Sequence, residues 1–445
     1  MDDETGERIK QARVARGISQ AELAASVGMS NSYLSHIEAG RRPVKDPIRL
    51  QIAAALGMDP QQLVDGVPAD RKEELRLRLS FAEMALRNGG WELAQTSFQE
   101  ALESARTMPL ERFVDEAHWG LARSLEATGR LEEAIAAYEE LLSKPALSGA
   151  VSGTSVRVAL VRAYRECGDL GRAVDVGERG LTELESAPAD ELGPHVELIS
   201  TLAGCYVERG DLTRAALLSR QALDLADQAS SMQARAAAAW EAAAVAQSRH
   251  EVAAARRHAD RALALYEELD SQRAVAMLRV VSAALFLRQD RPDPAKALPL
   301  LEQAFGDLSD AGNDVDLAYV RTEQARALLL SGRTEEAAET IGVALEALSE
   351  GDKLQRGRML LLRGHVARAA GQADDALSSF QDAASHLRQA GAVRQAATAW
   401  RELGEAYAEL GRPDDAIDAM RQSSDLLGVR LAPHSLAAVG NAVRK

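Results

Sequence analysis

Glycine and alanine recur together along this 445-residue chain, five residues apart and at an almost constant interval. His250 and Asp290 hold the place of the glycine where two copies are missing, and the interval is then 39 to 42 residues throughout. A fixed period over nine units predicts a solenoid of stacked supersecondary units. The seven complete Gly-x-x-x-x-Ala copies begin at Gly89, Gly129, Gly168, Gly210, Gly332, Gly371 and Gly411.

Each unit has the pattern of two helices joined at the glycine, which ends the first helix and permits the turn. Leu403 and Tyr407 share one face of a first helix, and Ala376 and Phe380 share one face of a second helix. Aromatic residues make up only 4% of the chain, and β-branched runs are scarce, so nothing indicates a sheet. We therefore predict an all-α fold in which about nine helix pairs, with helices of roughly 15 residues, span residues 72–427.

These units resemble the tetratricopeptide repeat (TPR), whose small residues let paired helices approach closely. The resemblance is weak in the fifth and sixth units, where the glycine is lost. There, Pro292, Pro294 and Pro299 are expected to disturb the second helix. The last unit matches the TPR pattern closely at Trp400, Leu403, Gly404, Tyr407, Gly411 and Ala416.

A segment near the N-terminus has the spacing of a helix-turn-helix. Ser19 and Glu22 form a capping box at the start of one short helix, and Gly28 supplies the backbone of a tight turn. A second helix begins after the cap Ser30 and presents small polar residues at its start. Two short helices joined around a glycine in this way predict a DNA-binding motif.

Residues 4–66 resemble the Cro/repressor-type helix-turn-helix domain of the xenobiotic-response-element (XRE) regulators, on the match at Leu34, Ile37, Glu38 and Gly40. The resemblance implies five helices, at 6–16, 20–27, 30–39, 47–56 and 60–64. Base contacts are expected from Asn31, Ser32 and His36, and phosphate contacts from Gln20, Tyr33, Arg41, Arg42 and Lys45.

The charge distribution agrees with DNA binding by this region only. The whole chain is acidic, with a net charge of −15, which argues against a general nucleic-acid coat or an anionic membrane as partner. Between Arg8 and Arg49, however, eight basic residues stand against three acidic ones. Because phosphate contacts supply much of DNA affinity, this basic island predicts double-stranded DNA as a partner.

A helix-turn-helix domain followed by a long TPR region resembles the peptide-responsive quorum regulators of the Rgg, PlcR, PrgX and NprR group. That resemblance implies a homodimer that binds an inverted-repeat operator, and a short signalling peptide held by the repeats. In a TPR the first helix of each pair lines the concave face, which predicts a ligand groove. The expected groove residues are Arg123, Arg162, Arg165, Trp240, Gln247, Arg326, His365 and Arg368.

Two interpretations of the groove arginines remain open. They could receive a carboxylate or acidic side chain of the ligand. They could instead pair with Glu126, Glu166 and Glu405 on neighbouring helices.

Enzymatic and membrane functions find no support in the sequence. It contains no phosphate-binding loop, nucleophile elbow or zinc-protease motif, and we expect no catalytic residue, metal or cofactor. Cys167 and Cys205 are too few and too far apart for a disulfide framework or a zinc site. No apolar run is long enough to span a membrane, and the N-terminus is polar, so we expect a cytoplasmic protein.

The sequence therefore predicts a transcriptional regulator with four parts: a DNA-binding domain at 1–66, a linker at 67–71, a TPR sensor and dimerisation domain at 72–427, and a C-terminal helix or tail at 428–445. The effector is a peptide or a small molecule. The alternative function is a DNA-bound scaffold that recruits a protein partner through its TPR groove. The short linker favours the regulator, because a solenoid that changes curvature could re-aim the DNA-binding domains directly.

Overall fold

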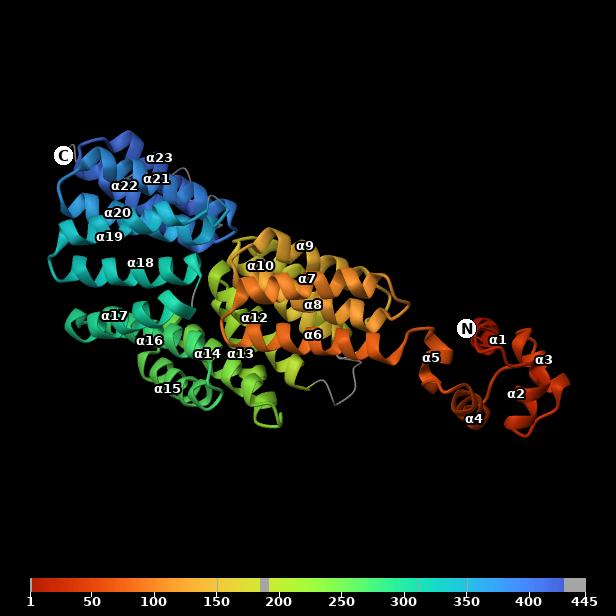
Figure 1. Cartoon of the computed structure of the whole chain (residues 1–445). Coiled ribbons are helices and arrows are strands. Elements are labelled where there is room, and N and C mark those ends of the chain that lie inside the picture. The colour runs from red at the N-terminus through yellow and green to blue at the C-terminus, as the bar shows by residue number, and fades with distance from the viewer. Residues whose placement is uncertain (1, 150, 185–191, 312, 350, 428–445) are drawn as a thin grey trace, which may run out of the picture. The chain divides into compact units, whose positions relative to one another are not determined.

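The computed structural model describes residues 2–149, 151–184, 192–311, 313–349 and 351–427. This part of the chain contains 23 helices and no strand, which confirms the all-α prediction (Figure 1). It divides into two compact units. The first unit comprises Met1–Ser124 and Ala146–Val151, and the second comprises Leu125–Pro145 and Ser152–Lys445. The predicted C-terminal helix or tail at 428–445 lies outside the described residues.

The first five helices form the predicted helix-turn-helix domain, with ends that differ from the prediction by a few residues. The Ser19–Glu22 capping box is present: the Glu22 amide donates to Ser19 Oγ at 3.2 Å, and the Ser19 amide donates to Glu22 Oε2 at 2.7 Å. Gly28 takes a φ of +67°, as the tight turn requires. The helices are α1 (Asp2–Ala15), α2 (Gln20–Ser26), α3 (Asn31–Glu38), α4 (Asp46–Leu56) and α5 (Pro60–Asp65).

Eighteen further helices make nine consecutive pairs within the described residues, as predicted. They are α6 (Ala69–Arg87) and α7 (Trp91–Arg106), α8 (Glu111–Ala127) and α9 (Leu131–Ser143), α10 (Gly153–Glu166) and α11 (Leu170–Leu184), α12 (Leu192–Arg209) and α13 (Leu212–Ala226), α14 (Met232–Ser248) and α15 (Val252–Glu268), α16 (Gln272–Leu287) and α17 (Pro294–Ala311), α18 (Asp314–Leu330) and α19 (Thr334–Ala347), α20 (Lys353–Ala369) and α21 (Ala373–Gln389), and α22 (Val393–Glu409) and α23 (Pro413–Leu426).

The predicted linker at 67–71 is wrong at its C-terminal end, because α6 already begins at Ala69. Only three residues, 66–68, separate α5 from α6, and the contacts of Asp65 with Val67 and Lys72 hold this segment in place. Asp65 accepts a hydrogen bond from the Val67 amide at 3.0 Å and forms an ion pair with Lys72 at 2.6 Å. Both charged side chains are about 90% buried, so the connection is a structured joint.

The fifth and sixth repeats, where the turn glycine is lost, depart from the prediction in different ways. His250 replaces the turn glycine with a φ of +61°, as expected, but Asp290 does not adopt a left-handed conformation. The expected disturbance by proline is also wrong. Helix α17 begins at Pro294, where a missing amide hydrogen costs nothing, and it continues through Pro299 to Ala311.

Neighbouring helices pack closely because glycines, which have no Cβ, lie where the helices cross. A Cβ on Gly364 of α20 would lie 2.4 Å from the ring of Phe380 of α21, and Phe380 is fully buried. Between consecutive pairs, Gly177 of α11 faces Leu202 of α12, where a Cβ would lie 2.8 Å from a methyl group. The small residues of the repeat therefore let side chains of the neighbouring helix fill the interior.

We predict that Gly364→Ala lowers the free energy of unfolding by about 1–3 kcal/mol, because the added methyl overpacks the Phe380 site. Gly342→Ala in α19 is the matched control, since its added Cβ would meet no atom within 4 Å. That change should stabilise the chain by about 0.5–1 kcal/mol through helix propensity. Urea denaturation followed by circular dichroism measures both, and equal effects of the two substitutions would contradict the packing argument.

Candidate functional site

Helix α3 has one face in the core and one face free. Leu34 and Ile37 are fully buried in the helix-turn-helix core. The base-reading candidates Asn31, Ser32 and His36 are all exposed on the other side. Ser35 is exposed on the same helix and was not among the predicted contacts, although its position between Ser32 and His36 already suggested it. The α3 surface thus presents a row of short polar side chains that can reach base edges.

The predicted phosphate contacts Arg41, Arg42 and Lys45 lie in the loop after α3 and are exposed. Within the described chain none of them has a carboxylate partner. The Arg42 guanidinium stacks over the Tyr33 ring at 5.3 Å from its centroid, which holds this cation beside α3. Four other basic residues of the domain are already paired with acids: Arg8 with Glu4, Lys10 with Glu7, Arg13 with Glu38, and Arg49 with Asp46. Among the described residues, the three loop cations next to the exposed face of α3 are therefore unpaired, as is Arg16 after α1, which bonds only the Ala12 carbonyl.

Gln20 stands at the first residue of α2, but part of its amide group is already in use. Its Nε2 donates to Glu38 Oε2 at 2.9 Å, which leaves one amide hydrogen for a phosphate. Glu38 also accepts two hydrogen bonds from Arg13, at 2.7 and 2.9 Å. This bidentate contact raises the pKa of Arg13. One buried carboxylate thereby joins α1, α2 and α3 and sets the orientation of the exposed α3 face.

We predict that Arg13→Ala lowers the local opening free energy of α2 and α3 by about 3 kcal/mol, because it leaves the Glu38 carboxylate buried with only Gln20 as partner. The control is Lys10→Ala, whose ion pair with Glu7 at 3.3 Å is half exposed. Exposed pairs contribute little, so this variant should stay within about 0.5 kcal/mol of the parent. Hydrogen–deuterium exchange of the full-length protein measures both, and unchanged protection in the Arg13 variant would contradict the role of Glu38.

The first helices of successive repeats contact one another directly. Helices α10, α12, α14, α16, α18 and α20 pack side by side in that order, and we call these six helices the inner layer. Among the described helices α9 to α19, no comparable contact joins one second helix to the next. The inner layer is therefore a continuous face of the second unit, as the TPR resemblance predicted for the ligand-binding side.

The arginines predicted for the groove all have carboxylate partners. Of the three carboxylates expected as possible partners, Glu126 pairs with Arg162, whereas Glu166 and Glu405 pair with none of these arginines. The pairs are Arg123 with Glu83 at 3.0 Å, Arg162 with Glu126 at 2.5 Å, Arg165 with Glu241 at 2.6 Å, Arg326 with Glu323 at 3.3 Å, and Arg368 with Glu402 at 3.6 Å.

The remaining groove candidates are not cationic. Burial lowers the pKa of His365 to about 4, with the Arg368 and Arg326 charges adding to the effect, so its imidazole is neutral at neutral pH. The His365 ring packs edge-on against Phe380 at 5.2 Å between centroids. Trp240 meets Tyr266 in the same geometry, with centroids 5.7 Å apart. Gln247 is half-buried, and its side-chain amide makes no hydrogen bond to the described residues.

Arg162 and Glu126 form the centre of a desolvated cluster. The Arg162 Nη2 donates to Glu126 Oε2 at 2.9 Å, and the Tyr138 hydroxyl donates to the same oxygen at 2.6 Å. Arg273 of α16 pairs with Asp316 of α18 at 2.6 and 3.0 Å and also acts on the pKa of Glu126. Despite its burial, Glu126 has a lowered pKa, because Arg162 and Tyr138 stabilise its charged form. Four charges from four helices are thus held as two ion pairs.

A second cluster joins distant repeats of the second unit. Glu208 at the end of α12 pairs with Arg358 of α20 and accepts a hydrogen bond from Gln395 of α22 at 3.1 Å. Arg165 passes close to Gly204, where an added Cβ would lie 2.3 Å from its guanidinium. No local sequence pattern indicates the contact between Glu208 and Arg358, because 150 residues separate the two side chains.

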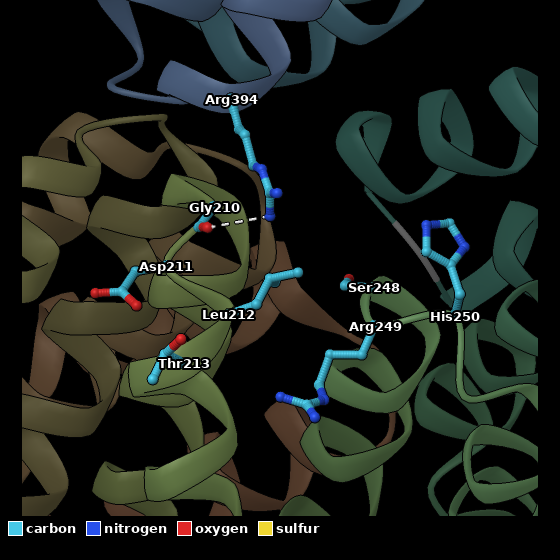
Figure 2. Close-up of a pocket in the computed structure, with 8 residues that line it drawn as sticks. All are labelled: Gly210, Asp211, Leu212, Thr213, Ser248, Arg249, His250 and Arg394. Atoms are coloured by element: carbon cyan, nitrogen blue, oxygen red, sulfur yellow. Dashed lines mark hydrogen bonds between the residues drawn. The ribbon is translucent and has the colours of Figure 1, made fainter. Parts of the chain in front are cut away.

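A pocket of about 680 Å³ lies near these contacts between α12 and the C-terminal repeats (Figure 2). Its walls are the α12–α13 turn, the α14–α15 turn and Arg394 of α22. In Figure 2 Arg394 points to Gly210, whose carbonyl accepts its hydrogen bond at 3.4 Å, whereas Arg249 and His250 point away from each other. Arg249 is paired with Glu251 at 2.7 Å. The basic groups of this pocket do not converge, and none of the predicted groove residues lines it.

The described ranges contain no metal site, reactive thiol or membrane-spanning helix. No group of three or more histidine, cysteine, aspartate or glutamate residues there is arranged to hold a metal ion. Cys205 is buried, and burial raises its pKa to about 12, which makes the thiol unreactive at neutral pH. None of the described helices combines the length and the apolar character needed to cross a membrane.

The profile of the MalT-like TPR region matches residues 81–394, which is most of the chain. This chain belongs to the MalT-like TPR family. The profile of a helix-turn-helix domain matches residues 4–65, in agreement with the domain predicted from the sequence. The protein therefore combines a helix-turn-helix DNA-binding domain with a TPR region. No curated protein sequence matches it.

Solved structures show similarity in fold. A Rap protein in complex with competence and sporulation factor has a TM-score of 0.57 at 13% identity, over 80% of this chain and 100% of the Rap chain. Bacillus thuringiensis PlcR, in complex with the peptide PapR7 and DNA, has a TM-score of 0.42 at 18% identity, over 64% of this chain and 99% of the PlcR chain. The first of these similarities supports the TPR solenoid fold of the repeat region.

Proposed function

We propose that this protein is a cytoplasmic, non-enzymatic transcriptional regulator that binds an inverted-repeat operator as a homodimer. Its TPR region binds an effector, a short signalling peptide, and effector binding controls operator binding. The observation that carries the DNA-binding part is the exposed polar face of α3 beside three cations that have no carboxylate partner among the described residues. Base edges and phosphates are the groups that such a surface is built to contact.

Two kinds of contact on this surface can be separated by experiment. Asn31 and His36 are proposed to read bases, so replacing either by alanine should reduce affinity for the operator by about 1–3 kcal/mol and relax the sequence preference. Arg42 is proposed to bind phosphate, so Arg42→Ala should weaken binding to all DNA similarly and reduce the salt dependence by about one unit of slope. The Tyr33 ring, on which Arg42 stacks, is retained in this variant.

The operator for these measurements is selected from random duplex DNA with the full-length protein, and affinities are measured at several salt concentrations. Lys10→Ala is the control, because Lys10 is paired with Glu7 on α1. The mass of the complex tests the homodimer, for which two chains per inverted repeat are expected. The assignment fails if alanine at Asn31 and at Arg42 weakens binding to operator and random DNA in the same proportion.

Effector binding is supported by the solenoid fold. The similar Rap protein was crystallised with competence and sporulation factor, so a solenoid of this fold can hold such a factor. The inner layer also offers accessible polar groups in desolvated surroundings, where a hydrogen bond or ion pair to a ligand is strong. A library of synthetic pentapeptides, tested for a rise in the melting temperature of the full-length protein, identifies peptides that bind its native state.

Coupling between the two parts is proposed to pass through the structured joint at 66–68. The Asp65–Lys72 ion pair ties the last helix of the DNA-binding domain to the first helix of the repeats. A change in the path of α6 would therefore move α5 with it. A ligand achieves this only if it binds one arrangement of the repeats more tightly than another.

We predict that four flexible residues, Gly-Ser-Gly-Ser, inserted between Gly66 and Val67 preserve both peptide binding and operator binding but abolish the effect of the peptide on operator affinity. The control carries the same four residues appended after Lys445. Operator affinity is measured with and without a pentapeptide that raises the melting temperature of the parent. Peptide control that survives the insertion at full strength would contradict coupling through the joint.

A further inference from the structure

Helix α6, the first helix of the repeats, has one buried apolar face and one exposed apolar face. The buried face includes Leu75 and Leu79, and the helix packs against α7. On the other side, Leu77, Phe81 and Met84 keep 61%, 46% and 51% of their surface exposed. Within the described residues, no other helix exposes more than one large apolar side chain. The exposed face of α6 is therefore the exception among the helices described.

The three exposed side chains form a continuous stripe. Their spacing is i, i+4 and i+7, which places them above one another on one side of the helix. This is the spacing at which one helix packs lengthwise against another. Single apolar side chains are ordinary on a protein surface, whereas a contiguous group of them marks an interaction site. We call Leu77, Phe81 and Met84 the α6 stripe.

The two ends of the α6 stripe carry charges of opposite sign. Glu73 precedes the stripe and Arg87 follows it, each about one helical turn away. The two side chains lie on the same flank of the stripe, because roughly four helical turns separate them. Each has an exposed ion pair within α6, Glu73 with Arg76 at 2.8 Å and Arg87 with Glu83 at 3.8 Å. Exposed pairs of this kind contribute little, so both charges remain available to a partner.

The apolar side chains of the stripe are complementary to a second copy of the same helix. In an antiparallel pair of α6 helices with the two-fold axis beside Phe81, Leu77 meets the partner's Met84. The same axis places Phe81 against the partner's Phe81. Such a contact is isologous, because each copy contributes the same surface. Two-fold pairing therefore covers the whole stripe on both copies.

The flanking charges select the antiparallel arrangement. In an antiparallel pair Glu73 lies beside the partner's Arg87, and the symmetry repeats this contact at the other end. A parallel pair would place the two Glu73 side chains together and the two Arg87 side chains together, and like charges repel. The antiparallel arrangement also opposes the two helix dipoles. Charge and apolar surface thus agree on one partner, a second copy of this chain.

The position of α6 in the chain connects this contact to the DNA-binding domain. Helix α6 begins directly after the structured joint, and the Asp65–Lys72 ion pair ties it to α5. A two-fold contact between α6 helices therefore restrains two DNA-binding domains with the symmetry that an inverted repeat requires. Three partly exposed side chains bury far less than the roughly 800 Å² per partner of a stable complex. The contact is thus suited to strengthen an assembly that the operator has already brought together.

We propose that two copies of this chain associate through the α6 stripe as an antiparallel pair of α6 helices when they occupy one operator. The inference rests on the proposed homodimer and names its interface beside the DNA-binding domain. It implies that the free chain dimerises weakly and that binding to the two half-sites is cooperative.

The first test compares the affinity of the full-length protein for the complete operator with its affinity for a duplex that carries one half-site. Phe81→Glu should reduce the preference for the complete operator at least tenfold, because it places two carboxylates in the centre of the apolar contact. Its affinity for the half-site should stay unchanged. Val343→Glu in α19 is the matched control, since Val343 is 48% exposed, and it should leave both affinities unchanged.

The second test exchanges the flanking charges. Glu73→Arg and Arg87→Glu should each reduce the same preference about threefold, because each creates like-charge contacts across the pair. The double variant should restore the preference, since its opposite charges meet again with the positions exchanged. Circular dichroism confirms the helix content of each variant. Rescue by the exchange is expected only if Glu73 and Arg87 meet on two copies of this chain.

The third test detects the contact by cross-linking. Ser80 is exposed and precedes Phe81, so the proposed axis brings the two copies of Ser80 close together. Ser80→Cys should give covalent dimers with a short thiol-specific cross-linker in the presence of the operator. The parent protein and Glu346→Cys, at an exposed position of α19, should give none.

Full cooperativity in Phe81→Glu, or no covalent dimer from Ser80→Cys on the operator, would overturn the α6 interface and leave the proposed regulator intact. Loss of cooperativity in Phe81→Glu without rescue by the charge exchange would contradict the antiparallel pairing. If the parent bound the complete operator no more tightly than the half-site, the interface and the proposed homodimer would both fail. If the full-length protein selected no operator, the proposed function would fail, and cross-linking of Ser80→Cys at high protein concentration would still decide the interface.

Discussion

Direct contact between the first helices of successive repeats is the constraint on which the charge arrangement of the second unit depends. Side chains on the shared face of α10, α12 and α14 lose part of their hydration, so a carboxylate partner stabilises an arginine there. The partner comes from the neighbouring repeat in the cases of Arg162 with Glu126 and Arg288 with Glu323, and from two repeats away in the case of Arg165 with Glu241. These ion pairs link successive repeats.

Two carboxylates of the inner layer do not follow this pairing. Glu166 and Glu197 lie in the same desolvated surroundings as the paired residues and carry no counter-charge among the described residues. Burial raises both of their pKa values, as it also raises that of Glu241 despite its ion pair with Arg165.

Contacts between repeats that are far apart in the sequence also stabilise the second unit. Leu170, at the start of α11, is fully buried in a cluster with Leu354, Leu387 and Ala390 of the C-terminal repeats. A Cβ on Gly168 would lie 3.2 Å from Ala390, so the turn glycine also permits this close approach. A solenoid whose repeats contacted only their neighbours would respond locally to a ligand. Here, the third helix pair and the last two helix pairs share one core.

The sequence alone determined the helices, their caps and turns and the DNA-binding face, because these depend on residues close in the chain. The Ser19–Glu22 capping box, the left-handed turn at His250 and the buried pair Leu34 and Ile37 were all predictable in this way. The tertiary structure decided which charges meet. The carboxylate that reaches Arg162 or Arg358 depends on the rotation between successive helix pairs, and a small rotation repeated over several pairs moves a side chain by many ångströms. The ion pairs that occupy the predicted groove arginines could therefore emerge only from the packed solenoid.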